Sequence, residues 1–138
     1  MLSKRAVVAR VGDTLFVHGG VLPKHVRYGL DRINDEAKRW LSGEGKTPPS
    51  QLVDETGPLW TRMYSAAPGR EECVVLDETL GLLHAKRLVM GHTVQKPKIS
   101  PACEGKAWRI DVGMSRAFGG PIQVLAIEGD DVKVIASP

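Results

Sequence analysis

A short apolar stretch of the chain has the sequence Thr14-Leu15-Phe16-Val17-His18-Gly19-Gly20. Its β-prone residues are too few for a helix and follow the turn pair Gly12-Asp13, so the stretch predicts a buried strand. A histidine at the end of such a strand lies at the carboxyl edge of the sheet, where open α/β sheets bind ligands. The two glycines allow the backbone to turn tightly there. From this stretch alone, a ligand-binding histidine and a histidine that only caps a strand are equally good interpretations.

A second stretch repeats this arrangement. Residues 88–90 form another short apolar run, and Gly91 and His92 follow it. Leucines at positions 76, 80 and 83 have helical spacing, which predicts a helix over residues 71–85 ahead of the run. Helix and strand together form an α/β unit that brings a second histidine to the edge of a sheet. The two histidines meet only if both strands run in the same direction in one sheet.

The remaining elements complete an α/β pattern. Residues 6–11 predict a strand that pairs with residues 14–18 in a hairpin, and residues 106–112 and a hairpin of residues 122–127 and 132–135 predict further strands. One long helix is predicted from its apolar face, which consists of Val26, Leu30, Ile33, Ala37, Trp40 and Leu41. Residues 94–102 predict a loop. Residues 57–65 predict a short helix or turn that carries Arg62, for which stacking on Trp60 is the non-functional alternative.

Composition excludes several classes of function. The 138 residues are 42% hydrophobic and 25% charged, which is typical of one soluble globular domain over residues 1–138. A net charge of only +3, with two phenylalanines and two tyrosines, disfavours nucleic-acid binding. No apolar run is long enough to span a membrane, and no secretory signal is visible. Because Cys73 and Cys103 form no C-x-x-C motif, we expect two reduced thiols and a cytoplasmic location, with an organelle not excluded.

The two histidines and the arginine define a possible hydrolytic half-site. Neutral imidazoles are good ligands for zinc, manganese or iron, and the glycine beside each histidine leaves room for a phosphate. A metal there would act as a Lewis acid and activate water, while an arginine would bind phosphoryl oxygens with its two-pronged edge.

Four blocks of sequence occur in a recognisable order. They are Phe16-Val17-His18-Gly19-Gly20, Leu59-Trp60-Thr61-Arg62, Val89-Met90-Gly91-His92-Thr93 and Trp108-Arg109-Ile110-Asp111-Val112-Gly113. This order resembles the carboxyl-terminal half of the calcineurin-like metallophosphoesterases, and within them the Shewanella-like protein phosphatase branch. The resemblance covers nearly the whole chain. Val94 replaces the second histidine of the wider superfamily's G-H-x-H motif, which favours phosphoprotein over nucleotide substrates.

The resemblance implies a fold, a mechanism and a role for each residue. The fold would be the carboxyl-terminal half of an α/β/β/α sandwich, a mixed sheet with flanking helices. His18 and His92 would bind the second ion of a dinuclear manganese, iron or zinc centre, and Arg62 would bind the phosphate. Phosphomonoesters would be hydrolysed by attack of a metal-bridging hydroxide on phosphorus. Asp111 corresponds to a structural acidic residue and not to a ligand, and His25 and His84 match no motif.

The chain departs from the family where the first metal ion is bound. The motifs D-x-H, G-D-x-x-D-R-G and G-N-H-[DE] are absent, and the one asparagine, Asn34, lies in a predicted helix. We therefore expect a partial domain that is inactive alone. It would be a fragment of a full phosphatase, a split subunit completed by an amino-terminal half, or a noncatalytic relative. A metal-free α/β interaction module is the alternative from a different class.

Overall fold

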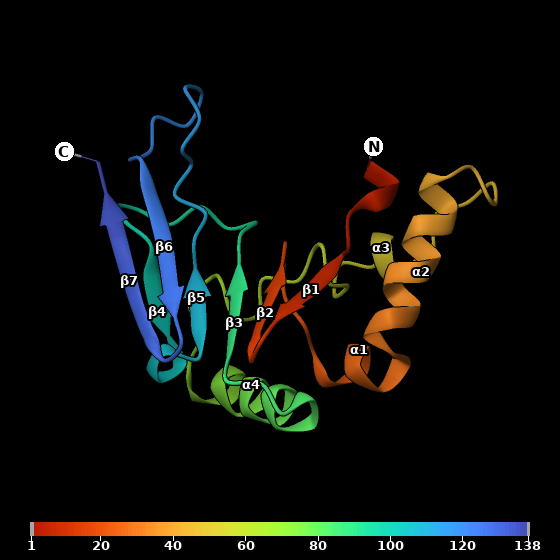
Figure 1. Cartoon of the computed structure of the whole chain (residues 1–138), viewed down its shortest axis with the longest axis horizontal. Helices are drawn as coiled ribbons and strands as arrows, with labels where there is room; N and C mark the ends of the chain where they lie inside the picture. Colours follow the sequence, from red (N-terminus) through yellow and green to blue (C-terminus); the bar gives the residue numbers. More distant parts are fainter. Residues whose placement is uncertain (1, 138) are drawn as a thin grey trace.

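The computed structural model describes residues 2–137 and contains a five-stranded mixed sheet (Figure 1). The strand order is β1-β2-β3-β5-β4, in which β2, β3 and β5 are parallel and the edge strands β1 and β4 are antiparallel to their neighbours. Helices flank this sheet, so the predicted α/β class with a mixed sheet is confirmed. The strand bounds are β1 (Val8–Val11), β2 (Thr14–Val17), β3 (Arg87–Met90), β4 (Ser100–Ala102) and β5 (Ala107–Arg109).

The helical pattern before residue 42 forms two helices instead of the one predicted. Gly29, with a φ of 107°, separates α1 (Pro23–Tyr28) from α2 (Leu30–Leu41). Glycine adopts this positive φ without the steric clash of a Cβ atom, so the chain turns there although the apolar spacing continues. The other helical elements are α3 (Ser50–Val53), α4 (Arg70–Leu83) and the 3₁₀ turns η1 (Leu2–Lys4) and η2 (Cys103–Gly105).

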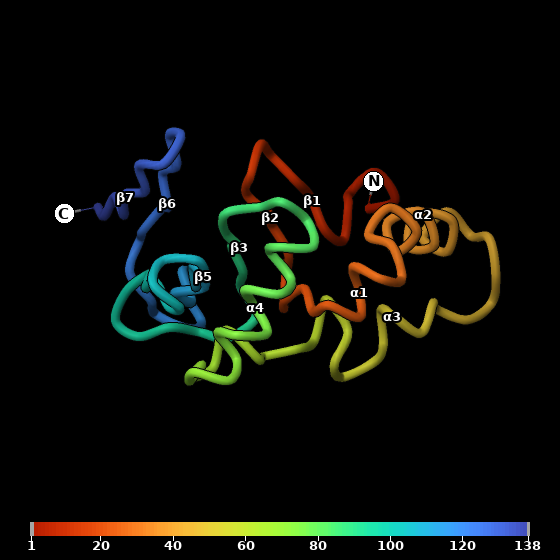
Figure 2. Tube along the Cα trace, turned by 90° about the horizontal axis from the view of Figure 1, so that it is seen from below, coloured from red at the N-terminus to blue at the C-terminus, as the bar shows by residue number. Residues whose placement is uncertain are grey.

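The core lies between the sheet and α4, which passes across β2 and β3 (Figure 2). Leu15 and Leu88 of the two central strands are buried against Leu76 and Leu80 of α4. All four side chains are at most 5% exposed. Burial of a leucine side chain contributes roughly 1.5–3 kcal/mol, so this cluster fixes the two strands whose ends carry the histidines.

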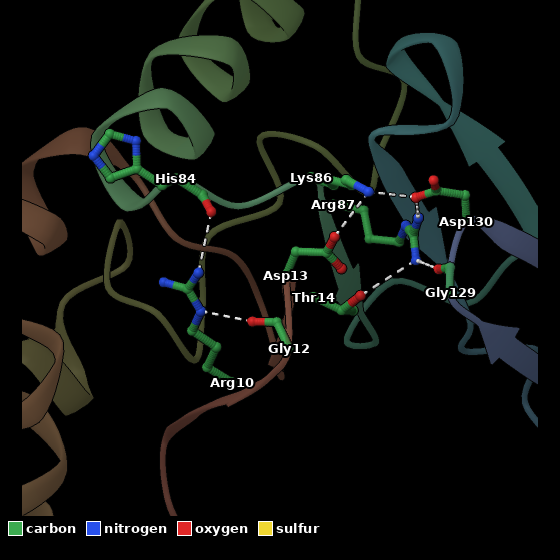
Figure 3. Close-up of polar contacts among 9 residues, drawn as sticks. All are labelled: Arg10, Gly12, Asp13, Thr14, His84, Lys86, Arg87, Gly129 and Asp130. Atoms are coloured by element: carbon green, nitrogen blue, oxygen red, sulfur yellow. Dashed lines mark hydrogen bonds and ion pairs between the residues drawn. The ribbon is translucent and has the colours of Figure 1, made fainter.

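The final hairpin forms a sheet of its own. Strands β6 (Gln123–Glu128) and β7 (Asp131–Ala136) pair with each other and with no other strand among residues 2–137. The turn between β6 and β7 forms polar contacts with residues at the starts of β2 and β3 (Figure 3). The Arg87 guanidinium donates to the Gly129 carbonyl oxygen at 2.9 Å, and the Lys86 ammonium forms ion pairs with Asp13 and Asp130. The predicted hairpin is confirmed.

Two features of the carboxyl-terminal part differ from the prediction. Residues 100–102, predicted as loop, form the edge strand β4, which pairs with β5. Pro101 lacks an N–H, and an edge strand tolerates such a residue where a central strand does not. The strand predicted over residues 106–112 is confined to β5. Among residues 2–137, no helix is both long and apolar enough to cross a lipid bilayer.

The prediction of two reduced thiols is wrong. Cys73 of α4 and Cys103 of η2 form a disulfide, with their Cα atoms 5.2 Å apart. The absence of a C-x-x-C motif excludes a local pair, but it has no bearing on cysteines that the fold brings together from two elements. The disulfide joins α4 to the β4–β5 end of the sheet.

Candidate metal and phosphate site

The parallel pairing of β2 and β3 brings His18 and His92 together. Val17 is paired with Met90 at the ends of the two strands, and the histidines follow at the same edge of the sheet. Nε2 of His18 lies 3.0 Å from Nδ1 of His92, and the ring centroids are 4.8 Å apart. The structure therefore brings both predicted metal ligands to one point.

The backbone at His92 has an unusual conformation. Its φ is 64°, and the Thr93 N–H donates to the Gly91 carbonyl oxygen at 2.7 Å across a three-residue turn. Such γ-turns with a positive central φ are rare and strained, and strain of this kind persists where the surroundings enforce it. One enforcing contact is the bond from the Gly91 N–H to the His18 carbonyl oxygen, 3.0 Å long.

The turn that carries Arg62 lies against the glycines after His18. The N–H groups of Gly19 and Gly20 donate to the Pro58 carbonyl oxygen at 2.9 and 3.1 Å. A Cβ atom on Gly19 would lie 2.9 Å from this oxygen and from the Leu59 carbonyl carbon, so the close approach requires a glycine. The sequence predicted a tight turn at this glycine pair, but it did not predict that the segment of Pro58 packs against it.

Arg62 points toward the histidines and is exposed. Its Nη1 donates to the His92 carbonyl oxygen at 3.2 Å and to Thr93 Oγ1 at 3.1 Å. Its Nε and Nη2 have no hydrogen-bond partner among residues 2–137, so this edge of the guanidinium is available to an anion. Arg62 does not stack on Trp60, the alternative that the sequence left open. Instead, the Trp60 ring makes an edge contact with His92 at a centroid distance of 5.8 Å.

The surroundings of His92 favour the neutral imidazole that a metal requires. Burial lowers the pKa of His92, and the charge of Arg62 and the proximity of His18 lower it further. The Nε2 atom of His92 is buried without a hydrogen-bond partner. With metal–nitrogen bonds of about 2.0–2.1 Å, two nitrogens 3.0 Å apart are close enough to bind one ion.

The site does not fit a dinuclear centre without further groups. Among residues 2–137, no set of three or more His, Cys, Asp or Glu side chains is placed to hold a metal ion. Asp111 follows β5 close to His92, but its Oδ1 accepts a hydrogen bond from the Gly113 N–H at 3.0 Å and stabilises that turn. The histidine pair alone therefore supplies two ligands to one ion, and no bridging carboxylate.

His25 and His84, which match no motif, lie away from this site in α1 and at the end of α4. His25 is fully buried in α1, where its Nδ1 accepts a hydrogen bond from the Leu22 N–H at 3.0 Å. His84 is exposed and ends α4 in the left-handed conformation with a φ of 47°. Neither residue contacts His18 or His92.

An apolar hollow of about 640 Å³ adjoins His18. Phe16, Val89 and Ile110 line it on the sheet, and Trp40, Leu52 and Trp60 line it on the side of the helices. The sheet face in this hollow is opposite to the face that packs on α4. Sequence reasoning did not predict this hollow, because its two walls come from residues far apart in the chain.

Comparisons with known proteins agree with the motif order. No protein-family model matches the chain. Shewanella-like protein phosphatase 2 of Arabidopsis thaliana is 39% identical over 142 residues, which is 99% of this chain and 36% of that protein. This chain is a relative of the Shewanella-like protein phosphatases. An uncharacterised protein of Schizosaccharomyces pombe is 34% identical over 87% of the chain and 37% of its own length. The chain thus spans little more than a third of these relatives.

Solved structures show the same fold. The cold-active protein-tyrosine phosphatase of a psychrophilic Shewanella species has a TM-score of 0.77 and 20% identity, covering 96% of this chain and 41% of its own. A point mutant of a cold-active protein tyrosine phosphatase has a TM-score of 0.78, with 21% identity. At such low identity the likeness concerns the fold alone. The sequence similarity to a Shewanella-like protein phosphatase is what supports a phosphatase at the level of the family.

Proposed function

We propose that this chain contributes the second-metal half of the active site of a metal-dependent phosphoprotein phosphatase. His18 and His92 bind one divalent cation, and Arg62 binds the phosphoryl group of the substrate. The observation that carries the proposal is the pair of imidazole nitrogens 3.0 Å apart, with an unpaired guanidinium edge beside them. The name of the Arabidopsis thaliana relative supports phosphoester hydrolysis as the reaction.

Each residue of the site has a separate task. The histidines are held at the ends of two paired strands, so their spacing requires little reordering when an ion binds. The Nε and Nη2 edge of Arg62 suits two phosphoryl oxygens, and its charge stabilises the negative charge that develops during phosphoryl transfer. A bound manganese, iron or zinc ion would supply Lewis-acid activation of the phosphate and of water.

The missing ligands are expected from a complementary amino-terminal half, whether in a longer chain or as a separate subunit. The apolar hollow supports docking of such a half, because its uncovered sheet face adjoins His18 and the chain spans about two fifths of the solved phosphatases. Apolar surface of this kind is buried in complexes more often than it is left in water. We expect the isolated chain to be inactive, and the substrate of the completed site to be a phosphoprotein.

Complementation with metal binding tests this function. The chain is titrated with Mn²⁺ and Zn²⁺ by calorimetry, and it is mixed with the amino-terminal part of a Shewanella-like phosphatase in an assay of phosphopeptide hydrolysis. We expect metal binding that falls at least about tenfold in His18→Ala, because one of two ligands is lost. We expect hydrolysis only in the mixture, and a loss of about 10²–10³-fold in Arg62→Ala. Equal metal binding by His18→Ala, or hydrolysis by the mixture that is unaffected by Arg62→Ala, would contradict the proposal.

A metal-free interaction module is the second candidate, and the apolar hollow favours it. In that case the chain would bind its partner through the hollow equally well with and without a chelator. Substitution of the exposed Ile110 by Asp in the hollow would weaken that complex, while His92→Ala, outside the lining of the hollow, would leave it unchanged. Metal binding that depends on His18 and His92 would favour the metal-dependent phosphatase over the interaction module.

A further inference from the structure

A pair of hydroxyl groups lies behind Arg62. Ser65 is fully buried, and its Oγ lies 2.7 Å from Oγ1 of Thr93. The same Thr93 oxygen accepts the hydrogen bond from Nη1 of Arg62 at 3.1 Å. Because a guanidinium has only donors, Thr93 must act as the acceptor, and the buried serine fixes the position of its hydroxyl.

Gln95 ties the two segments of this arrangement together. Its Nε2 donates to the carbonyl oxygens of Ser65 and Thr93 at 2.9 and 2.8 Å, and its N–H donates to the Asp111 carbonyl oxygen at 2.7 Å. The turn that contains Arg62 and the loop that contains His92 are therefore joined by three side chains. These hydrogen bonds lie next to the strained backbone of His92.

We propose that Thr93, supported by Ser65 and Gln95, is a positioning residue that holds the Arg62 guanidinium at the histidine pair and thereby sets the affinity for phosphate. The inference deepens the function proposed above and rests on it. An exposed arginine loses rotamer freedom when it binds an anion, and a guanidinium already held in place loses less. The contact uses one nitrogen and leaves the other edge free, so it orients the group without occupying its binding edge.

The experiment compares three variants of the chain. Thr93→Val keeps the shape of the side chain and removes the acceptor, Thr93→Ser keeps the hydroxyl, and Thr47→Val is the matched control at an exposed loop position. The first readout is the NMR signal of the Arg62 guanidinium in the metal-free chain, assigned by its loss in Arg62→Ala. We expect a resolved signal in the wild type, in Thr93→Ser and in Thr47→Val, and an averaged signal in Thr93→Val.

The second readout is the dissociation constant of inorganic phosphate in the presence of Mn²⁺. Loss of one hydrogen bond of this kind weakens binding about three- to tenfold, and we expect this in Thr93→Val alone. Mn²⁺ affinity should stay within about twofold in all variants, since Thr93 is no ligand. A wild type that binds neither Mn²⁺ nor phosphate would overturn the proposed function, while the guanidinium signal would still test the positioning.

An unchanged guanidinium signal and an unchanged phosphate affinity in Thr93→Val overturn the inference. If Thr93→Val does not fold, as judged by its amide spectrum, Ser65→Ala replaces it. This variant keeps the acceptor but removes its buried partner, and we expect a smaller loss of phosphate affinity in the same direction. Equal phosphate affinity in Ser65→Ala and the wild type would then overturn the inference.

Discussion

His25 shows how a single side chain can link the stability of this fold to pH. The imidazole is fully buried in α1, and this burial, together with the charge of Lys24, lowers its pKa from 6.5 to about 4. At neutral pH it is therefore uncharged, as its role as acceptor for the Leu22 N–H requires. A motif search has no means of finding this histidine, since its role follows from burial and from the hydrogen bond to the Leu22 N–H.

We expect the free energy of unfolding to fall as pH decreases from about 6.5 toward 4. In this range the unfolded chain protonates His25 and the folded chain does not, so protons favour unfolding by up to roughly 1.4 kcal/mol per pH unit. Urea unfolding of the wild type and of His25→Gln at pH 7, 6, 5 and 4.5 measures this effect. The variant should show a smaller loss, and His84→Gln serves as the exposed control. Parallel pH profiles for wild type and His25→Gln would contradict the assignment.

Some residues of the candidate site could be predicted from the sequence, and others could not. His18, His92 and Arg62 were singled out because short motifs contain them, and Gly19 because tight turns use glycine. The contact between Trp60 and His92 and the roles of Ser65 and Gln95 were not predicted. The sequence signals near them were the positions of Trp60 and Thr93 within recognised blocks. Ser65 and Gln95 had none, because hydrogen bonds between distant segments leave no local pattern.

At the scale of elements, local periodicity located the strands and helices, and tertiary contacts decided their limits. The apolar runs that end before His18 and Gly91 form β2 and β3 nearly as predicted. The sequence could not show that these strands are parallel neighbours, because register depends on the packing of both against α4. The break at Gly29 interrupts no hydrophobic pattern and was missed for that reason.

Asn34 supports the edge strand β1. The sequence has no other asparagine, and its position in a predicted helix argued against a role as a metal ligand. Its Oδ1 accepts hydrogen bonds from the N–H groups of Val7 and Val8 at 2.8 and 3.0 Å, and its Nδ2 donates to the Val8 carbonyl oxygen at 2.9 Å. The side chain thus joins α2 to the backbone at the outer edge of the sheet.

We expect Asn34→Ala to lower the free energy of unfolding by about 1–3 kcal/mol, because three backbone groups lose their partner. Asp35→Ala, on the exposed side of the same helix, should change it by less than about 0.5 kcal/mol. Urea unfolding of the three proteins measures both values. An effect of Asn34→Ala no larger than that of Asp35→Ala would show that water replaces the side chain at this edge.

At the scale of the whole molecule, the disulfide between Cys73 and Cys103 constrains the chain most. It closes a segment with a sequence separation of 30 residues, which contains β3 and β4. The expectation of a cytoplasmic location rested on reduced thiols, and the disulfide removes that support. An oxidised pair is common in compartments that permit disulfide formation.

Reduction of the disulfide should lower the free energy of unfolding by about 3–4 kcal/mol, the entropic contribution expected for a loop of this length. Urea unfolding with and without reductant, and of the variant with both cysteines replaced by serine, provides the measurement. The double variant should be insensitive to reductant. Equal stability of the oxidised and reduced wild type would contradict the expectation and indicate that the loop is already ordered in the unfolded chain.

The register of β2 and β3, with Thr14 opposite Arg87 and Val17 opposite Met90, has a consequence for the two imidazoles. A slip of one residue would displace His18 along its neighbour by about 3.3 Å and reverse the side toward which it projects. The backbone hydrogen bonds between β2 and β3 thus determine how far apart the two rings lie. Substitutions that preserve that ladder keep the two strand ends side by side, and the strained turn at His92 then sets the direction of its ring.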